Sequence, residues 1–175
     1  LIVDALNVPS PIDHIEFICD PKRPTPHMPA PGGRERWEFM LRAGETRDMM
    51  ESDARVAELL RPWMTPDQLR IERRAVYRFH ARCCEAFGRG RIVLAGDAAH
   101  ITPPFVGQGL VAGLRDAANL SWKLAAVVKG QAAPEILASY DVERRPHARA
   151  MIGLAKLMGG MVMPRSALRA MAAHG

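Results

Sequence analysis

The segment from Ile92 to Lys129 constrains the fold of this chain more than any other part of the sequence. It opens with the apolar run Ile92–Asp97, which is typical of a buried strand that ends in Gly-Asp and faces a ligand there. The loop AAHITPPFVGQG follows, and apolar residues then recur three or four positions apart up to Lys129, before Gly130. The segment therefore predicts a strand, a ligand-facing loop and a helix of about five turns.

Two features of this segment suit a polar, partly anionic ligand. The Asp97 carboxylate can accept hydrogen bonds from two hydroxyls of a sugar alcohol, and Gly96 lets such a ligand approach the backbone. Gly107 and Gly109 free the loop backbone, so that N–H groups are exposed at the positive end of the helix. Taken alone, each motif also has an ordinary structural explanation. Gly-Asp can simply end a strand, and Gly-Gln-Gly can simply connect a loop to a helix.

The part of the chain before this segment predicts an antiparallel sheet and one helix. Strands are indicated by runs rich in Val, Ile, Phe and Trp or by alternating apolar and polar residues, at 1–8, 14–20, 36–42 and 69–82. The stretch 21–33 contains five prolines, which remove donors from a strand ladder, so we expect a loop or an edge strand there. Helical spacing predicts an amphipathic helix within 51–63. Beyond the segment, 134–140 and 145–163 also read as helical.

Composition places the chain among packed globular proteins, because 48% of its 175 residues are hydrophobic and 25% are charged. No apolar run approaches the roughly 20 residues that a membrane span needs. The cysteines Cys19, Cys83 and Cys84 form neither a CxxC pair nor an even set, which predicts buried free thiols in a reducing, cytoplasmic compartment. The histidines and cysteines lack metal-ligand spacing, so we expect no metal.

Positive charge is concentrated in residues 61–175, which carry 17 basic against 8 acidic side chains and so account for the net charge of +5. A basic surface can attract nucleic acid, an acidic membrane or an anionic small molecule. Only Trp122 and Tyr140 are aromatic beyond residue 105, which disfavours nucleic acid because bases stack on aromatic side chains. A basic binding module without chemistry stays open as an alternative class, and steep salt-dependent retention on nucleic acid would favour it.

The motifs GDAAH, PP, GQG and RDAANLSWKL, in this order, resemble the flavin-binding segment of the FAD-dependent aromatic hydroxylases, the para-hydroxybenzoate hydroxylase-like flavin monooxygenases. The flanking stretches CDPKRPTPHMPAPGGRERWEFML and SYDVERRPHARAMI are most similar to the 3-(3-hydroxyphenyl)propionate hydroxylase branch. The resemblance implies an α+β fold in two parts. Residues 1–80 would be part of an antiparallel substrate-domain sheet, and residues 81–175 would supply the closing strand and helices of a Rossmann-like FAD-binding domain.

The same resemblance implies roles for the residues of the loop. Asp97 would hold the ribityl chain of FAD, Gly96 would permit its approach, and Pro104 would lie against the flavin ring. The backbone around the pyrimidine edge of the flavin would come from Gly107, Gln108, Gly109, Leu110 and Val111. The helix that starts there would stabilise negative charge on the reduced flavin. No side chain is assigned as an acid or base, and we expect His100 to make a structural hydrogen bond.

The implied activity is that of an NAD(P)H-dependent FAD monooxygenase in aromatic compound catabolism, which uses O₂ to hydroxylate a phenolic compound through a flavin C4a-hydroperoxide. Related FAD enzymes that epoxidise, halogenate or reduce remain alternatives. Trp37 and Phe39 are candidates for the substrate pocket, with core packing as the alternative. For Arg144 and its neighbours in ERRPHAR we expect a solvated or interdomain face rather than substrate binding.

The sequence departs from the family pattern at several points. Val111 stands where many relatives carry Asn, so a side-chain hydrogen bond is lost there while backbone donation is kept. The GxGxxG fingerprint, the later Asp-Gly motif and a further carboxy-terminal domain do not occur in these 175 residues. The start at Leu1 also suggests a piece of a longer protein. We therefore expect the chain alone to be inactive, to lose FAD during purification and to expose apolar surface.

Overall fold

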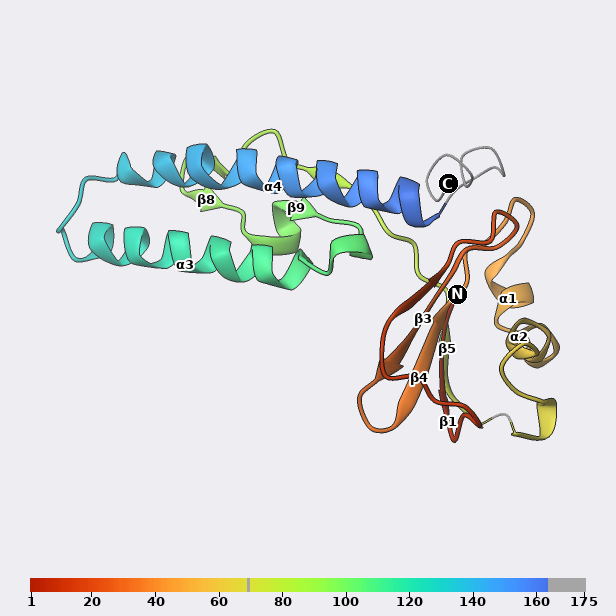
Figure 1. Ribbon diagram of the computed structural model, residues 1–175. Coiled ribbons are helices and arrows are strands. Elements are labelled where there is room, and N and C mark those ends of the chain that lie inside the picture. The colour runs from red at the N-terminus through yellow and green to blue at the C-terminus, as the bar shows by residue number, and fades with distance from the viewer. Residues whose placement is uncertain (69, 164–175) are drawn as a thin grey trace. The chain divides into compact units, whose positions relative to one another are not determined.

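The computed structural model describes residues 1–68 and 70–163 (Figure 1). The chain separates into two compact units, a sheet unit built on Leu1–Arg78 and a helix unit formed by Phe79–Gly159. The sheet unit holds a five-stranded sheet and two short helices, and the helix unit holds two long helices and short strand pairs. The α+β class predicted from the sequence is confirmed.

All pairings in the five-stranded sheet are antiparallel, and the strand order is β2-β3-β4-β1-β5. The strands are β1 (Ile2–Leu6), β2 (Glu16–Ile18), β3 (Thr25–Ala30), β4 (Arg34–Glu38) and β5 (Arg70–Ala75). The strands predicted at 1–8 and 14–20 are confirmed with shorter bounds. The strand predicted at 36–42 is also present, but it begins two residues earlier, at Arg34, and ends at Glu38. The strand predicted at 69–82 ends at Ala75, with a separate short strand β6 at Arg82–Cys83.

The prediction of a loop or an edge strand for 21–33 is wrong, because β3 lies inside the sheet with a neighbour on each side. The two neighbours overlap at a single residue, since β2 pairs with residues 25–27 and β4 pairs with residues 27–30. Pro26 is therefore paired only with β2, and Pro29 only with β4. Each proline has a paired strand on one side only. An interior strand can therefore contain these residues although they lack an N–H donor.

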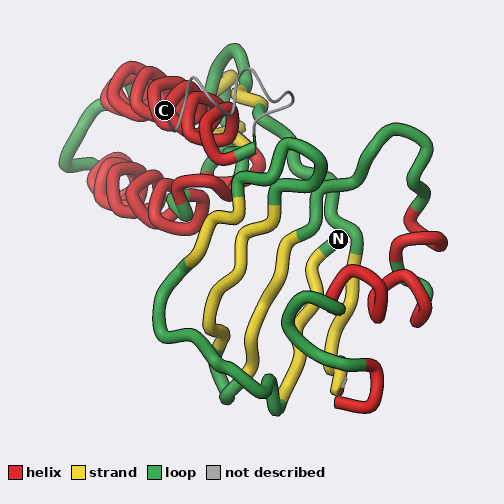
Figure 2. Tube along the Cα trace, turned by 45° about the vertical axis from the view of Figure 1, so that its right-hand side comes forward, coloured by secondary structure: helices red, strands yellow, loops and turns green. Residues whose placement is uncertain are grey.

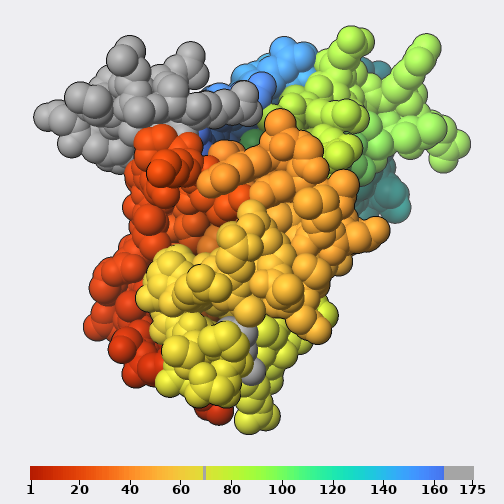
Figure 3. Space-filling view, turned by 90° about the vertical axis from the view of Figure 1, so that its right-hand side faces the viewer, coloured from red at the N-terminus to blue at the C-terminus, as the bar shows by residue number. Residues whose placement is uncertain are grey.

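One face of this sheet is covered by α1 (Arg47–Met50) and α2 (Asp53–Leu60), which lie on the same side of it in Figure 1 and dominate the view in Figure 3. Each helix has a side-chain cap, because Thr46 accepts from the amide of Met49 and Ser52 accepts from that of Arg55. A 3₁₀ turn, η1 (Pro66–Gln68), follows. The core between sheet and helices consists of Leu1, Val3, Ala5, Trp37, Phe39, Met50, Val56, Leu60 and Met64.

In the helix unit, α3 (Gly109–Val128) and α4 (Ile136–Val162) run side by side (Figure 1, Figure 2). The predicted helix up to Lys129 is confirmed, with Gly130 left-handed at φ +69°. The two helical stretches predicted after it form one helix that contains Pro146. The predicted strand Ile92–Asp97 is a strand only at its start.

Short elements complete the helix unit. Two two-stranded pairings join β6 (Arg82–Cys83) to β9 (His100–Ile101) and β7 (Gly88–Arg89) to β8 (Ile92–Val93). Two 3₁₀ turns, η2 (Gly96–Ala98) and η3 (Pro104–Val106), lie between β8 and α3. The core of the unit consists of Phe87, Ala99, Leu120, Tyr140 and Ala148. No helix in the described residues is both long enough and apolar enough to cross a membrane.

The side of α3 that packs inside its unit is not the apolar stripe from which the sequence predicts the helix. Leu110 and Leu114 of that stripe are 77% and 60% exposed. The residues that α3 buries are Ala112, Asp116, Leu120 and Lys123, two of which are charged. Specific polar contacts therefore decide which side of α3 faces the rest of its unit, and apolar surface is left uncovered within the described chain.

Gly159 of α4 provides a test of packing against η3. A Cβ there would lie 2.5 Å from Cε2 of Phe105, whereas a Cβ at Gly160 would meet nothing within 4 Å. We predict that Gly160→Ala raises the free energy of unfolding by up to about 1 kcal/mol through helix propensity. Gly159→Ala should instead lower it by about 1–3 kcal/mol because Phe105 must move. Urea unfolding of both variants checks this, and equal changes would show that α4 does not pack on Phe105.

Candidate functional site

Asp97 lies in η2, where its side chain is exposed. The preceding Gly96 is left-handed at φ +57°, a conformation that favours glycine. A Cβ at Gly113 of α3 would lie only 3.4 Å from the Cα of Gly96. The loop backbone therefore sits close against the helix, and this contact holds Asp97 at the surface near the start of α3.

The loop then turns into α3 without a side-chain cap. Pro104 opens η3, and Gly107 ends it in the left-handed region at φ 60°. Gln108 is the N-cap of α3, but its side chain accepts no hydrogen bond from the first turn. The first-turn amides, which belong to Gly109, Leu110 and Val111, therefore lack the usual capping acceptor at the positive end of a helix of 20 residues.

The two parts of this loop are joined through Asp116, which is fully buried in α3. Its Oδ2 accepts hydrogen bonds from the amide of Gly96 at 3.1 Å and from Nε2 of His100 at 2.6 Å. Its Oδ1 accepts from Nε of Arg144 in α4 at 2.8 Å. One carboxylate thus connects the Gly-Asp loop, the strand that follows it and both long helices.

The environment keeps Asp116 ionised. Burial alone would raise the pKa of this carboxyl, but the hydrogen bonds from Arg144, His100 and the Gly96 amide together hold the pKa below its ordinary value. The charged form is therefore the stable form within the protein interior, where the Asp116 carboxylate accepts hydrogen bonds from three donors.

Two predictions about these residues have different outcomes. The expected structural hydrogen bond of His100 is confirmed by its contact with Asp116. The solvated or interdomain face expected for Arg144 is wrong, because Arg144 is 8% exposed and its guanidinium binds Asp116. Sequence reasoning also missed Asp116 itself. A charged residue is usually on the surface, and nothing local connects RDAANL to ERRPHAR across 28 residues.

A second polar cluster fixes α3 to α4. Lys123 is 1% exposed and donates from Nζ to Asn119 Oδ1 and to Glu143 Oε2, both at 2.9 Å. Hydrogen bonds from Asn119 and Lys123 lower the pKa of Glu143 to about 2. Tyr140 of α4 also donates to the carbonyl of Leu94 at 2.9 Å, which ties this helix to the segment before Gly96. The motif RDAANLSWKL is therefore used largely for internal contacts.

The other candidate residues, Trp37 and Phe39, lie in the sheet unit and are 0% and 3% exposed. Trp37 stacks on His27 with ring centroids 4.5 Å apart, and Phe39 contacts Trp63. Their burial beneath α1 and α2 favours the core-packing alternative over a direct pocket-lining role. The three cysteines are free but half-buried rather than buried.

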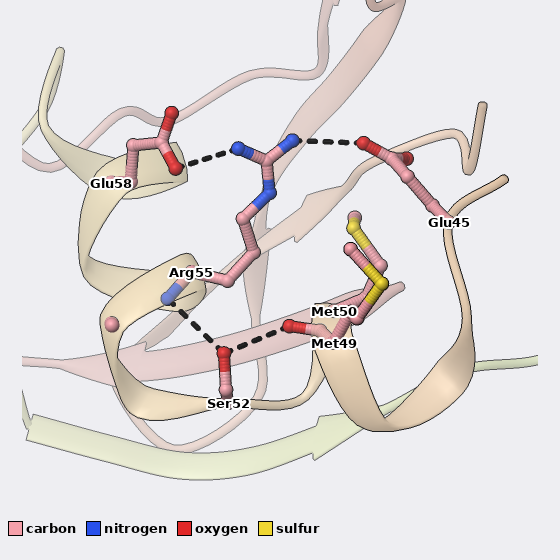
Figure 4. Close-up of a pocket in the computed structure, with 7 residues that line it drawn as sticks. Glu45, Met49, Met50, Ser52, Arg55 and Glu58 are labelled. Carbon is pink, nitrogen blue, oxygen red and sulfur yellow. Dashed lines mark hydrogen bonds and ion pairs between the residues drawn. The ribbon is translucent and has the colours of Figure 1, made fainter.

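A cavity of about 450 Å³ lies beside α1 and α2 (Figure 4). Arg55 lies at the centre of the lining and forms ion pairs with Glu45 at 2.8 Å and with Glu58 at 2.6 Å. Its positive charge is therefore neutralised by residues that also line the cavity. The other lining residues are Met49, Met50, Ser52 and Ala54. Within the described part of the chain, no cluster of His, Cys, Asp and Glu could hold a metal ion.

The buried carboxylate can be tested through stability. Asp116→Asn should lower the free energy of unfolding by about 3–5 kcal/mol at neutral pH, because Arg144 loses its buried counter-ion. The pKa of Asp116 is lowered in the fold, so this contribution is complete above the ordinary carboxyl pKa of about 4 and fades as pH falls through the lower folded value. Urea unfolding from pH 7 to pH 2 measures it.

The matched control is Asp53→Asn, which removes a 92%-exposed carboxylate that pairs with Arg74 and should change stability little. A neutral-pH effect of Asp116→Asn as small as that of Asp53→Asn would contradict the role of Asp116 as the central ion pair. So would an effect that stays constant down to the lowest pH.

Comparison with known proteins connects this geometry to a family. Residues 1–155 match the model of a family described as FAD binding domain. The chain is 47% identical over 165 residues to a 3-(3-hydroxy-phenyl)propionate/3-hydroxycinnamic acid hydroxylase of Mycolicibacterium smegmatis, covering 94% of this chain and 29% of that protein. It is 45% identical to a protein of the same name from Comamonas testosteroni, covering 95% and 28%. The chain thus spans less than a third of the length of these relatives.

Solved structures agree with this assignment. The p-nitrophenol 4-monooxygenase of Pseudomonas putida superposes with a TM-score of 0.82 at 28% identity, over 99% of this chain and 47% of that one. An aklavinone-11 hydroxylase, solved as a ternary complex with FAD and aklavinone, gives a TM-score of 0.83 at 26% identity, over 99% and 33%. With its family model matched over most of its length, this chain belongs to the FAD binding domain family and is a homologue of FAD-dependent aromatic hydroxylases.

Proposed function

We propose that this chain is part of an NAD(P)H-dependent FAD monooxygenase that hydroxylates a phenolic acid of the 3-(3-hydroxyphenyl)propionate type. The observation that carries the proposal is the loop between β8 and α3. It presents the exposed Asp97 and a run of uncapped helix amides, and the buried Asp116 fixes its Gly96 end. The relatives named above hydroxylate this type of substrate.

The residues present fit a flavin. Gly96 and Gly107 are both left-handed, which a Cβ would strain, and a Cβ at Gly107 or Gly109 would meet no atom within 4 Å. The backbone at these positions is therefore open to a planar ligand. FAD, when bound, supplies the oxygen-transfer chemistry, with NADH or NADPH as reductant.

Each part of the loop then has a role in holding that group. Asp97 would accept hydrogen bonds from ribityl hydroxyls, and Pro104 would lie against the ring. Amide groups from Gly107, Gln108, Gly109, Leu110 and Val111 would surround the pyrimidine edge. The positive end of α3 would favour negative charge there without any side-chain base, because its amides are fixed before the reaction begins.

The two binding roles are assigned to different parts of the chain. We propose that residues 1–80 belong to the substrate-binding domain and residues 81–175 to the FAD-binding domain. Trp37 and Phe39 would then support the substrate-domain sheet from its core side. The three free cysteines support a reducing, cytoplasmic location.

The proposed activity is tested by supplying the FAD-loaded complete protein, of which this chain is a part, with 3-(3-hydroxyphenyl)propionate, O₂ and either NADH or NADPH. Nicotinamide oxidation should accelerate with the phenol present, and a ring-hydroxylated product should appear in step with O₂ uptake. Nicotinamide oxidation that is indifferent to phenols and yields no hydroxylated product would refute the proposal.

The role of Asp97 leads to a binding prediction. Asp97→Ala should weaken FAD binding by about 1.5–3 kcal/mol for each charge-assisted hydrogen bond lost. This corresponds to a dissociation constant about ten to more than a hundred times higher. Fluorescence titration of the complete apoprotein with FAD measures the change.

Glu135→Ala is the control, because Glu135 is another exposed carboxylate of the same unit that lies outside the loop. Its FAD affinity should equal that of the parent protein. If Asp97→Ala also binds FAD with the parent affinity, Asp97 is not the ribityl anchor.

A further inference from the structure

The turn η3, which leads into α3, is packed against α4 through the ring of Phe105. The helix α4 runs back along α3, so Gly159 near its end lies beside this turn (Figure 1). A Cβ at Gly159 would lie 2.5 Å from Cε2 and 2.6 Å from Cδ2 of Phe105, which is closer than real Cβ atoms approach. The ring therefore occupies the space that a side chain at Gly159 would need.

The other glycines of α4 make no such contact. Glycine is a poor residue for a helix interior, and α4 contains it at positions 153, 159 and 160. A Cβ at Gly153 or Gly160 would meet no atom within 4 Å, whereas Gly159 is buried and receives the ring. We call the contact between Phe105 and Gly159 the ring seat.

The turn that carries Phe105 is restrained along its length. Pro103 and Pro104 each fix their own backbone φ, and the amide of Gly107 donates to the carbonyl of Pro104 at 2.9 Å. The carbonyl of Gln108, the next residue, accepts from the amide of Ala112 in α3 at 2.9 Å. A displacement of Phe105 would therefore be passed on to both Pro104 and the start of α3.

The residues on either side of Phe105 include the exposed ones of this turn. Pro104 and Gly107 are exposed, while Phe105 between them is half-buried. The first-turn amides of α3 follow and have no side-chain cap. Donors that are fixed in advance stabilise a developing negative charge better than donors that must reorganise. The ring seat therefore fixes, from the buried side, the groups that the proposed function places at the flavin.

The two ends of the loop have separate anchors. The Gly96 end is held by Asp116 of α3 and carries Asp97, whose proposed partners are the ribityl hydroxyls. The η3 end is held by the ring seat and leads into backbone amides, which act on charge. Disturbing the first end should thus change FAD affinity, whereas disturbing the second should change the ease of flavin reduction.

Resting on the FAD-binding part of the proposed function, we infer that Phe105, seated on Gly159, is a positioning residue that sets the reduction potential of the bound flavin. Phe105 acts through η3 rather than by touching a reacting group. Loss of the ring seat leaves the first-turn amides of α3 less fixed, so negative charge on the reduced flavin is less favoured. The equilibrium between oxidised and reduced FAD therefore changes more than the affinity for oxidised FAD.

The test measures the reduction potential of FAD in the complete protein by spectroelectrochemical titration, and the FAD dissociation constant by fluorescence titration. Phe105→Ala and Gly159→Ala should each lower the equilibrium constant for two-electron reduction about tenfold, which is less than the full effect of a helix terminus on a partly buried charge. A tenfold change corresponds to a potential about 30 mV lower. The dissociation constant of oxidised FAD should change much less.

Gly160→Ala is the matched control, because it adds the same methyl group one residue further along α4, where it meets no atom within 4 Å. Its potential should equal that of the parent protein. In the combined variant Phe105→Ala/Gly159→Ala the new methyl group has no ring to displace, so the potential should match that of Phe105→Ala alone. Circular dichroism checks the folding of each variant. If Gly159→Ala does not fold, Phe105→Ala against the parent protein decides the inference.

The outcomes separate this inference from the proposed function. An unchanged or raised potential in Phe105→Ala with FAD bound refutes the role of Phe105, and so do additive shifts in the combined variant or equal shifts for Gly159→Ala and Gly160→Ala. The proposed function still stands in these cases if the parent protein hydroxylates the phenol. If the predicted shifts occur but the parent protein hydroxylates no phenol, the proposed function fails while the role of Phe105 stands. A parent protein that binds no FAD refutes both.

Discussion

The fully buried carboxylate of Asp116 is the contact on which the helix unit depends. It accepts hydrogen bonds from the Gly96 amide, His100 and Arg144, which belong to three segments far apart in the sequence. Removing water from a charge is costly, and only this full set of donors offsets that cost. Asp116 of α3 therefore fixes the Gly96 end of the loop between β8 and α3, while Asp97 stays exposed.

The sheet unit has a buried aspartate with a different consequence. Asp4 is also held by an arginine, Arg36, but a second arginine, Arg73, remains without a full counter-ion. In the helix unit the first-turn amides of α3 lack a side-chain cap, and in the sheet unit the second guanidinium lies 3.8 Å from the shared carboxylate. We propose that these uncapped amides serve the flavin.

Local sequence patterns predicted much of this structure. The spacing of apolar residues located α3 to within one residue, and the Gly-Asp and Gly-Gln-Gly motifs located both ends of the candidate loop. The proline-rich strand β3 was missed because its tolerance depends on two neighbours that overlap only at His27. Asp116 and Arg144 were missed because their pairing spans 28 residues and charged side chains are usually exposed. Spacing reveals periodic packing, whereas a buried ion pair is decided by tertiary contacts.

The central claim is that Asp116 supports FAD binding through the loop that carries Asp97. A double-mutant cycle on the FAD dissociation constant tests it most directly, using Asp116→Asn, Asp97→Ala and the combined variant, with folding of each checked by circular dichroism. If Asp116 acts through this loop, its substitution should weaken FAD binding in the parent protein but have little further effect once Asp97 is absent, giving a coupling energy above about 0.5 kcal/mol. Strictly additive effects would contradict the claim.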